Sequence, residues 1–519
     1  MSGLGKGVVS SSVAKIMQLR GQRVSCVKID PYLNYDAGTM NPVAHGEVFV
    51  TEDGGECDMD IGNYERFLNQ DMPRSHNITT AQIYSAVIKA ERDGKYLGAC
   101  VQIIPHVTDE IKDRIRQIAN NECLDVLIVE CGGTVGDIES LPFLEAMRQL
   151  RIEDGANNVA FIHVTLAPSL DVVGEQKTKP TQHSVQELRR IGIQPDFLAL
   201  RCTRPLETVT KKKVALFSNV DINSVLSCHD VESVLQMVHV LWDQGLADAL
   251  PKRLGLSYEH LRGWRDWSGI VESMLNHTGD TVRIAMVGKY VRLTDSYVSV
   301  NDALKHAGAK IHRSVDISWI DSEDLPNDLS EYDGILVPGG FGTRGADGIM
   351  EAATTARIAN IPYLGICFGF QLAVVEFGRN VLGLDADSTE IKPDTNDPVI
   401  CLLPGRGGES GMGGTLRLGA NDIKICRDSV AFGIYGTEII SKRHRHRYEF
   451  NQTYRQTFEK AGMFFPADSD SGRRIEMLEI PKHPFFVGVQ FHPEFSSRPG
   501  FPEGVFEAFI KASASEKST

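Results

Sequence analysis

Apolar residues in the first half of the chain gather in short, nearly continuous runs that alternate with amphipathic stretches. The clearest runs are Arg23–Asp30, Leu124–Cys131, Val159–Ala167 and Phe197–Cys202. They are rich in β-branched residues, which is typical of strands that helices cover on both faces. Such strands, alternating with helices, predict a mainly parallel, doubly wound α/β sheet.

A second series of apolar runs begins after a stretch in which the apolar period weakens. Trp264 and Trp267 stand among charged residues there, and we interpret 263–280 as a linker. The later runs are Thr281–Gly288, Gly334–Pro338, Ile361–Cys367 and Phe485–Phe491. Two doubly wound α/β domains are therefore predicted, at 1–262 and 281–511, with the small, polar residues 512–519 as a disordered tail.

Length and composition agree with two ordinary globular domains. The 519 residues are too many for one hydrophobic core, and hydrophobic residues make up 42%. A net charge of -14 argues against a nucleic-acid-binding protein. The sequence contains no apolar run long enough for a membrane span and no secretion leader, and its ten cysteines form no CxxC pair. A cytoplasmic protein with reduced thiols is expected.

Cys367 lies between two glycines in the segment GICFG, directly after an apolar run. The helical pattern Gln371–Arg379 follows it. A strand, a tight turn and a helix with a nucleophile at the turn form the elbow of many hydrolases, and a helix N-terminus favours the thiolate. A lone cysteine is more often a small core residue, so this interpretation depends on its partners.

His492 and Glu494 supply such partners, because they follow the apolar run Phe485–Phe491. The histidine can deprotonate the thiol and later protonate leaving ammonia, while the carboxylate orients the imidazole. The segment Pro338–Gly342 follows a third strand, and backbone N–H groups near Gly340 can stabilise an oxyanion. Three unrelated strand ends are the alternative, but nucleophile, base and oxyanion donors together favour one catalytic site.

The region from about Thr281 to Lys511 resembles a class I glutamine amidotransferase domain on these residues. The resemblance implies that Cys367 is the nucleophile and that His492 and Glu494 complete the triad. It implies that glutamine is held by Gly340, Phe368, Gly369, Phe370, Gln371, Glu390 and Arg447. Without the family, the run of arginine and histidine that ends at Arg447 is a solvated loop or an anion site. The glycine-dense stretch 404–414 is predicted to be a flexible loop, either a mobile lid or a plain surface loop.

Residues suited to phosphate binding open the chain. The segment Ser2–Gly7 reads SGLGKG and leads into the helical pattern Val8–Leu19. Glycines let backbone N–H groups approach a phosphate, and the lysine and the helix N-terminus add positive potential. The signal is weak by itself, because the full GxxxxGK[ST] pattern is absent.

Carboxylates at strand ends predict a magnesium site in the same half. Asp58 and Asp60 lie in the acidic segment DGGECDMDIGN, and Glu130 follows an apolar run directly. Mg²⁺ prefers oxygen ligands from one or two carboxylates together with substrate phosphates. Asp60 and Glu130 are favoured as ligands, and Asp58 is alternatively a solvated acid. Lys28 opens the segment KIDPYLN at a strand end, the edge where such sheets bind ligands.

Four long motifs occur in order: KIDPYLN, the segment His45–Phe67, GGTVGDIES at 132–140 and KTKPTQ at 177–182. As a bare pattern the last is either an anion pocket in a turn or an exposed loop. Together the motifs resemble the P-loop-like amidoligase domain of the CTP synthase family, over about Ser2 to Leu261. Family membership implies ATP-dependent amination of UTP to CTP, with ammonia from glutamine, through a 4-phosphorylated UTP and an interior ammonia channel.

The resemblance also implies binding roles, residue by residue. ATP is expected at Gly3, Leu4, Gly5, Lys6, Gly7, Val8, Asp60, His229, Asp230 and Val231. UTP, or CTP as a feedback inhibitor, is expected at Ser2, Asp137, Ile138, Glu139, Lys177, Thr178, Lys179, Pro180, Thr181, Gln182 and Lys213. Lys6 and Lys28 would stabilise the transferred phosphoryl group, and Asp60 and Glu130 would hold Mg²⁺. Activation by GTP, homotetramers and filaments are further properties that the family implies.

One departure from the family concerns the start of the chain. The family has a strand and a Thr-Gly-Gly-like turn before the residues that match Ser2, so we expect this chain to be N-terminally incomplete. If so, UTP amination is lost while glutaminase activity survives. Two other hypotheses are a synthetase that aminates another acceptor and a catalytically impaired filament or regulatory partner. The first is disfavoured because the sequence has no SGGxDS-like loop of GMP synthases, and because cobyric-acid amidases would not explain KTKPTQ with GGTVGDIES.

Overall fold

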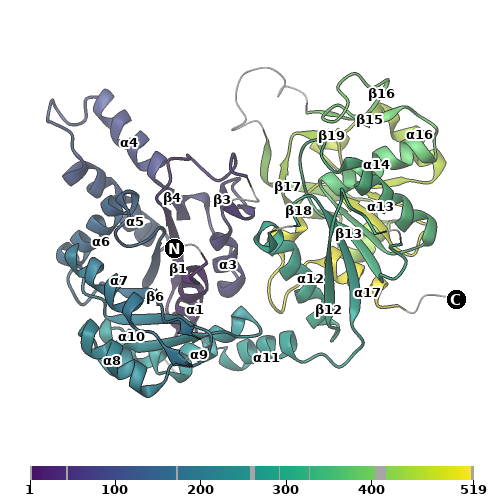
Figure 1. Ribbon diagram of the computed structural model, residues 1–519. Coiled ribbons are helices and arrows are strands. Elements are labelled where there is room, and N and C mark those ends of the chain that lie inside the picture. Colours follow the sequence, from purple (N-terminus) through teal and green to yellow (C-terminus); the bar gives the residue numbers. More distant parts are fainter. Residues whose placement is uncertain are drawn as a thin grey trace. The chain divides into compact units, whose positions relative to one another are not determined.

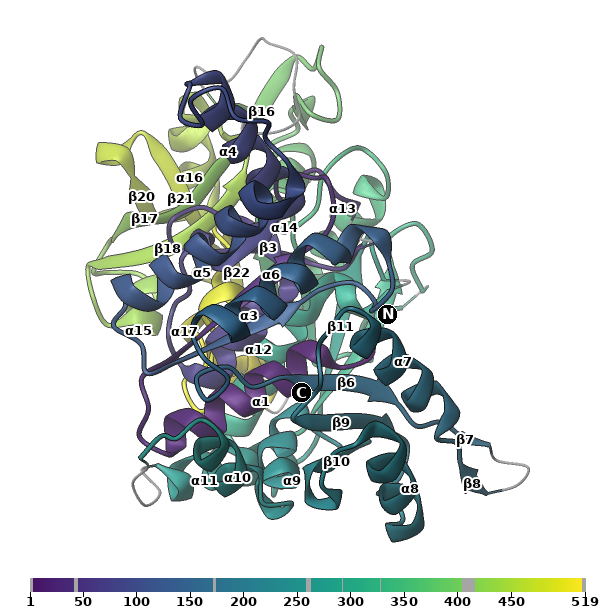
Figure 2. The same ribbon diagram turned by 90° about the vertical axis from the view of Figure 1, so that its left-hand side faces the viewer.

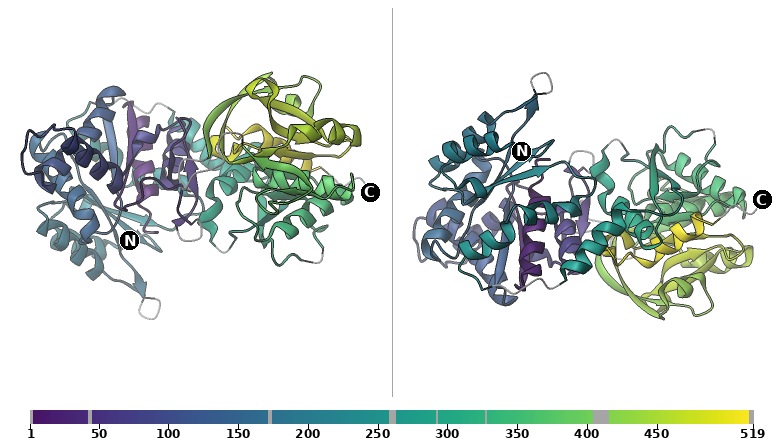
Figure 3. Two further views of the ribbon diagram at one scale, coloured as in Figure 1. Left: turned by 90° about the horizontal axis from the view of Figure 1, so that it is seen from above. Right: turned by 90° about the horizontal axis from the view of Figure 1, so that it is seen from below.

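The computed structural model describes residues 3–41, 45–170, 174–257, 263–291, 293–326, 328–403 and 416–515. Ser2, the glycine-dense stretch 404–414 and the last residues, 516–519, lie outside this description. The chain divides into two compact units (Figure 1): Met1–Asp36 with Asp60–Glu272, and Ala37–Met59 with Ser273–Thr519. Figure 3 shows both units from two further sides. In the described part, no helix is long and apolar enough to cross a membrane.

Two three-stranded parallel sheets form the framework of the first unit. The first has the order β4 (Asn77–Thr79), β1 (Val24–Asp30), β5 (Val126–Cys131), and the second has the order β10 (Val225–His229), β9 (Phe197–Cys202), β6 (Ile162–Leu166). The predicted strands and their parallel pairing are confirmed. They form two sheets rather than the one predicted, because β5 and β6 are edge strands and no described strand pairs with both. Strands β7 (Ser169–Leu170) and β8 (Glu175–Gln176) form a small arm beside the second sheet (Figure 2).

Helices cover both sheets of the first unit. Ile29 of the first sheet packs in one core with Ile115 and Met147, and Leu198 of the second packs with Val185 and Val214. The helices are α1 (Lys6–Leu19), α3 (Met59–Leu68), α4 (Thr80–Arg92), α5 (Thr108–Asn121), α6 (Leu141–Glu153), α7 (Lys179–Arg190), α8 (Thr208–Ser218), α9 (Met237–Asp243), α10 (Leu246–Arg253) and α11 (Trp264–Leu275).

Helix α11 occupies most of the stretch that was predicted to be a linker. Trp267 is buried against Phe67, and Trp264 stacks on Trp242 with ring centroids 4.4 Å apart. The weak apolar period of the sequence reflects a helix that buries only a narrow stripe, of which Trp267 and Val271 are the buried members.

A nine-stranded mixed sheet forms the second unit. Its order is β12 (Val315–Asp321), β11 (Val282–Gly288), β13 (Gly334–Val337), β14 (Tyr363–Ile366), β22 (Phe486–Val489), β21 (Arg474–Glu479), β20 (Phe464–Ser469), β17 (Arg417–Ile425), β18 (Ile439–His446). The first five strands are parallel, as predicted, and the rest are antiparallel. A smaller sheet consists of β15 (Ala386–Ser388), β16 (Asp397–Leu402) and β19 (Tyr448–Phe450).

Two apolar cores lie on the two faces of the large sheet. One contains residues of α13 (Ala346–Ala359), α14 (Phe368–Asn380) and α16 (Arg455–Ala461). The other contains residues of α12 (Val298–Lys310), α15 (Val430–Tyr435) and α17 (Gly504–Ser513). Helix α17 runs two residues past the predicted start of the disordered tail, because Phe509 and Ile510 are fully buried and the Ser513 hydroxyl donates to the Phe509 carbonyl.

Residues 37–59 were predicted to belong to the first domain, yet they pack with the second unit. We call them segment 37–59. Strands β2 (Val48–Val50) and β3 (Glu56–Asp58) of this segment form an antiparallel hairpin. The sequence patterns on either side belong to the first domain, so only tertiary contacts could show that this segment docks elsewhere. All ten cysteines are free thiols, as predicted.

Candidate active site

Cys367 occupies the predicted elbow between β14 and α14. Its backbone is left-handed, with φ 50° and ψ -92°, a conformation that a residue with a side chain adopts only under strain. The Cys367 N–H donates to the Val489 carbonyl at 2.7 Å, which ties the turn to the neighbouring strand β22. The strain therefore falls on the residue expected to be the nucleophile.

The glycines on either side of Cys367 are required by close packing. A Cβ atom on Gly369 would lie 2.4 Å from the Val337 carbonyl oxygen. A Cβ atom on Gly365 would lie 2.7 Å from the carbonyl carbon of Gly369. Neither backbone atom can move away without displacing a strand of the sheet or the helix. Only glycine therefore fits at these two positions of the segment GICFG.

His492 lies directly after β22 and is oriented by Glu494. Its Nδ1 lies 2.7 Å from Glu494 Oε1, and its ring stacks on Phe495. Its Nε2 is buried and has no hydrogen-bond partner among the described residues. Burial lowers the pKa of His492, but the charges of Glu494 and Cys367 outweigh burial and raise this pKa from 6.5 to about 10. The geometry leaves Nε2 available to exchange a proton with the thiol.

The Cys367 thiol is buried and has two polar neighbours. The Arg445 carbonyl oxygen lies 3.8 Å from Sγ, and the Gln490 side-chain amide donates to Sγ at 3.6 Å. Sequence reasoning missed both residues. Gln490 is the second-last residue of the predicted strand Phe485–Phe491. A polar residue within this apolar run was the one signal that could have indicated its role.

The candidate glutamine-binding residues surround the Gly340 loop and the start of α14. A Cβ atom on Gly339 would lie 2.8 Å from the His492 ring, which places this loop beside the imidazole. The Gly342 N–H donates to Glu390 at 2.8 Å, and burial raises the pKa of Glu390. Arg447 Nε is buried and has no hydrogen-bond partner among the described residues, so this guanidinium retains a donor for a substrate carboxylate.

Phe368, Gly369, Phe370 and Gln371 form the first turn of α14 and are all buried. The Gln371 amide donates to the Tyr448 carbonyl at 2.9 Å. Lys289, which sequence reasoning missed, places its ammonium 3.8 Å from the centre of the Phe368 ring and donates to the Phe341 carbonyl at 3.1 Å. Burial lowers the pKa of Lys289 to about 8. Its position one residue after the run Thr281–Gly288 was the available signal.

Replacing Glu494 with glutamine is expected to lower the pKa of His492. A carboxylate this close shifts a histidine pKa by about 1–3. The step in the pH profile of Cys367 alkylation that reports deprotonation of His492 should therefore move to lower pH by at least about one. The protonated form of His492 stabilises the fold, and the sign follows from its raised pKa. That contribution is complete below pH 6.5 and is lost as the pH rises through about 10. An unchanged alkylation profile in a normally folded variant would contradict the assignment.

Lys28, Asp60 and Glu130 meet in the first unit. Lys28 Nζ contacts Asp60 Oδ2 and lies 3.3 Å from Glu130 Oε1, and Tyr64 donates to Glu130 at 2.5 Å. Burial raises the pKa of Asp60, but Lys28 outweighs burial and the net pKa is lowered. Burial and the charge of Asp60 raise the pKa of Glu130. Since Lys6 also lowers both pKa values, it lies within electrostatic reach of the cluster.

This donor set suits magnesium. No group of three or more His, Cys, Asp or Glu side chains able to hold a metal occurs within the described ranges. The buried carboxylate of Glu130 and the partly buried carboxylate of Asp60, beside the candidate phosphate loop, nevertheless fit Mg²⁺, which completes its shell with substrate phosphates and water. Asp60 and Glu130 are the residues that would hold it. Asp58 ends β3 and belongs to the second unit.

The candidate phosphate loop leads into the N-terminus of α1. Gly3 and Gly5 have φ values of 71° and 86°, which favour glycine. A Cβ atom on Gly7 would lie 1.9 Å from Asp60 Oδ1, so Gly7 brings the helix start against the candidate metal ligand. Leu4 and Val8 complete the stretch from Gly3 to Val8.

Arg201 links the phosphate loop to the candidate adenine segment, and sequence reasoning missed it. Its guanidinium pairs with Asp230, and its Cδ lies 3.9 Å from the place of a Cβ on Gly5. His229 ends β10, and Asp230 and Val231 follow it. Arg201 belongs to the predicted strand Phe197–Cys202, where a charged residue near the carboxyl end was the available signal.

The candidate UTP residues are only partly brought together. Lys177 Nζ lies 2.6 Å from Glu175, and Lys213 of α8 also lowers the pKa of this carboxylate. KTKPTQ is not the turn that was predicted: α7 begins at Lys179, because Pro180 has a backbone suited to a first helical turn. Thr178, Thr181 and Gln182 are buried, whereas Lys179 and Pro180 are exposed. Asp137, Ile138 and Glu139 lie in an exposed stretch after β5.

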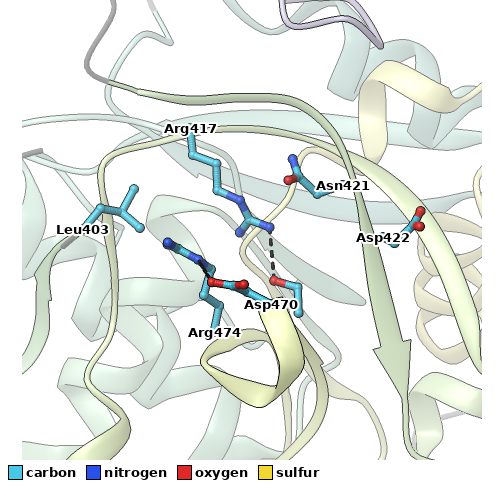
Figure 4. A pocket seen from close by; sticks show the side chains of 7 residues that line it. Leu403, Arg417, Asn421, Asp422, Asp470 and Arg474 are labelled. Carbon is cyan, nitrogen blue, oxygen red and sulfur yellow. Dashed lines mark hydrogen bonds and ion pairs between the residues drawn. The ribbon is translucent and has the colours of Figure 1, made fainter. Parts of the chain in front are cut away.

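The second unit also contains a pocket of about 350 Å³ (Figure 4), and none of its lining residues is among the candidate catalytic or glutamine-binding residues. It is lined by Leu403, Arg417, Asn421, Asp422, Ser469, Asp470 and Arg474. Arg417 pairs with Glu476 and Arg474 pairs with Glu449, both at 2.7 Å. Its cations are thus neutralised within the protein, and the pocket has no excess charge that would select an anion.

Comparison with known proteins gives the family. Residues 1–256 match the family model described as CTP synthase N-terminus, and residues 292–512 match glutamine amidotransferase class-I. A protein of Thermococcus kodakarensis named CTP synthase is 54% identical over 525 residues, which cover 100% of this chain and 97% of that protein. The chain belongs to the CTP synthase family. Family members from Methanopyrus kandleri and Microcystis aeruginosa are 51% and 48% identical and cover 99% of the chain, with 98% and 94% of their own lengths.

Among solved structures, a Trypanosoma brucei chain titled "CTPS - glutaminase domain with bound acivicin" is similar to part of this chain. The two are 40% identical, and the match covers 46% of this chain and 96% of that one, with a TM-score of 0.42.

Proposed function

We propose that this protein converts UTP to CTP with nitrogen from glutamine and energy from ATP. The observation that carries the proposal is the full-length similarity to CTP synthases, 54% over 525 residues. Two separate clusters of reactive side chains on the chain support it: Cys367 with His492 and Glu494 in the second unit, and Lys28 with Asp60 and Glu130 in the first. Each cluster suits one half of the reaction.

The second unit hydrolyses glutamine. Cys367 Sγ attacks the side-chain amide, and Nε2 of His492 takes the thiol proton and gives it to the leaving ammonia. Glu494 keeps the imidazole in place through Nδ1. The backbone N–H groups of Phe368, after the nucleophile, and of Gly340 are suited to the oxyanion. Water then releases glutamate from the thioester.

Substrate glutamine is held by Arg447 and Glu390. The free Nε donor of Arg447 suits the substrate α-carboxylate. Glu390 suits the α-ammonium group, since its other contact is the Gly342 N–H. Phe370 and Gln371 support the elbow from within α14, where both are buried.

The first unit activates UTP. ATP lies over the loop from Gly3 to Val8, and its γ-phosphoryl group passes to O4 of UTP, which turns this oxygen into a good leaving group. Lys6 and Lys28 stabilise the charge on the transferred group, a mainly electrostatic task. Asp60 and Glu130 would hold Mg²⁺, which would supply positive charge to offset that of the ATP phosphates. Ammonia, delivered through an interior channel, displaces the phosphate at C4.

Regulation and assembly are proposed on family membership alone. They comprise activation by GTP, feedback inhibition by CTP at the UTP site, homotetramers that can stack into filaments, and a cytoplasmic location. The proposed UTP and CTP contacts are those given above, from Ser2 to Lys213. The domain limits 1–262 and 281–511 remain proposals for the two catalytic modules.

An absorbance assay of CTP formation tests the function. The purified chain, with UTP, ATP and Mg²⁺, is expected to form CTP both with glutamine and with ammonium chloride, and to form none without ATP. If the chain forms no CTP with glutamine and none with ammonium chloride, while it still releases glutamate, the proposed synthase activity is contradicted.

A further inference from the structure

Two arginines lie on one face of β18, and both contact segment 37–59. Arg443 and Arg445 are two positions apart, so their side chains leave the strand on the same side. Arg443 Nε donates to Glu52 and Arg445 Nε donates to Glu56, each at 2.8 Å. His444, on the opposite face, bonds Glu476 at 2.9 Å instead.

Arg445 differs from Arg443 in what else it contacts. Its carbonyl oxygen lies against the Cys367 thiol, at 3.8 Å from Sγ. Its guanidinium lies 5.2 Å from the centre of the Phe341 ring, and Phe341 follows Gly340 in the candidate oxyanion loop. One residue therefore contacts the nucleophile through its backbone and the oxyanion loop through its side chain.

Segment 37–59 fixes the direction of the Arg445 guanidinium. Besides the pair with Glu56, the Gly38 carbonyl accepts from Arg445 Nη2 at 3.2 Å. The ion pair is largely buried, with the Arg445 side chain 13% exposed and that of Glu56 6%. A Cβ atom on Gly38 would lie 2.2 Å from Glu56 Oε2, so a glycine makes room for the carboxylate.

The segment itself is held firmly against the second unit. Glu47 accepts from the Ser299 N–H at the start of α12, at 3.2 Å. The Ala420 N–H donates to the Glu52 carbonyl at 2.8 Å. Gly419, with φ 79°, lets this backbone approach, since a Cβ there would lie 2.7 Å from the Glu52 carbonyl oxygen. The Glu56 carboxylate thus has a fixed support.

We propose that Arg445 is a positioning residue for glutamine hydrolysis, held by Glu56, which sets the oxyanion loop relative to Cys367. The inference rests on the proposed glutaminase activity of the second unit. A guanidinium that is paired with Glu56 and packed on Phe341 restricts the loop that carries Gly340. Because hydrolysis depends on donors placed for the transition state, loss of this support affects turnover more than glutamine binding. Glu56 precedes Asp60 by four residues, so the segment that supports the glutaminase site continues directly into the candidate magnesium site.

Glutamate release by the full chain, measured over a range of glutamine concentrations, tests the proposal. Arg445→Met and Glu56→Gln are expected to lower kcat about 10- to 100-fold, as small misplacements of catalytic groups do, with little change in KM. Arg445→Lys keeps the charge but lacks the planar fork, so it should recover part of the lost kcat. Glu47→Gln is the matched control: it changes another carboxylate of segment 37–59, which accepts from the Ser299 N–H at the start of α12, and should retain wild-type kcat.

Two results would overturn the proposal. One is a wild-type kcat in Glu56→Gln, which keeps the size of the side chain and decides the question even if Arg445→Met does not fold. The other is an equal loss in Glu47→Gln, which would show that docking of the whole segment matters rather than Arg445. CTP formation from ammonium chloride in the same preparations separates this inference from the proposed function. Its absence in the wild type would oppose the synthase, while glutamate release would still report on Arg445.

Discussion

Cys367→Ala is expected to abolish CTP formation from glutamine and to leave CTP formation from ammonium chloride intact. Cys367 is the proposed nucleophile at the elbow, and loss of the nucleophile from a catalytic triad lowers kcat on the order of 10⁶-fold. The fold should be unaffected, because alanine keeps the Cβ atom and adopts the same left-handed backbone. The measurement is absorbance-monitored CTP formation with each nitrogen source, together with glutamate release.

Cys401→Ala is the matched control for this prediction. Cys401 lies in β16 of the same unit, is partly buried and stands opposite Glu449 of β19. It should retain both activities. Substantial CTP formation from glutamine by Cys367→Ala, or loss of the ammonia-dependent reaction, would contradict the division of labour between the two units.

Lys28→Met is expected to lower CTP formation from both nitrogen sources and to leave glutamate release unchanged. Lys28 Nζ contacts Asp60 and lies 3.3 Å from Glu130, and it is one of the two lysines proposed to stabilise the transferred phosphoryl group. Loss of one electrostatic stabiliser of a transition state typically costs about 10²–10³-fold in rate. The measurement is CTP formation at saturating UTP and ATP, with glutamate release followed in parallel.

The same substitution should also destabilise the first unit. It removes the buried ammonium group that pairs with Asp60 and Glu130, and removal of one partner from a buried ion pair costs about 3–5 kcal/mol. Lys112→Met is the control, since Lys112 is equally buried and pairs with Asp109 and Glu153 in the same unit. That variant should lose stability, measured as the midpoint of thermal unfolding, but keep CTP formation. Normal CTP formation by a folded Lys28→Met variant would contradict the proposed role of Lys28 in phosphoryl transfer.

The Cys367 elbow was predictable because its causes are local. An apolar run ends at Cys367, which lies between Gly365 and Gly369, and a helix begins at the next position. The structure places Val337 and Gly369 so close that the same two glycines are required sterically. His492 and Glu494 were predictable for a similar reason, because they follow a strand whose end lies beside the elbow in a parallel sheet.

The sequence was less informative about residues whose role depends on distant partners. Arg445 and Glu56 are 389 positions apart, and neither stands in a pattern that indicates the other. Arg201, Lys289 and Gln490 are single polar residues near strand ends, where many such residues serve only solubility. Their contacts with Asp230, Phe368 and Cys367 follow from the packing of whole elements.

By itself, the sequence determined the two α/β domains, the strand positions and the candidate residues of the two reactive clusters. These follow from hydrophobic period, glycine positions and residue type, which act over a few neighbouring positions. The tertiary structure decided three further features: the pairing of the first unit's strands into two sheets, the helical form of 264–275, and the docking of segment 37–59 on the second unit. Each feature depends on which surfaces pack against one another. The free energy of that packing is set by two distant segments together and cannot be read from either one alone.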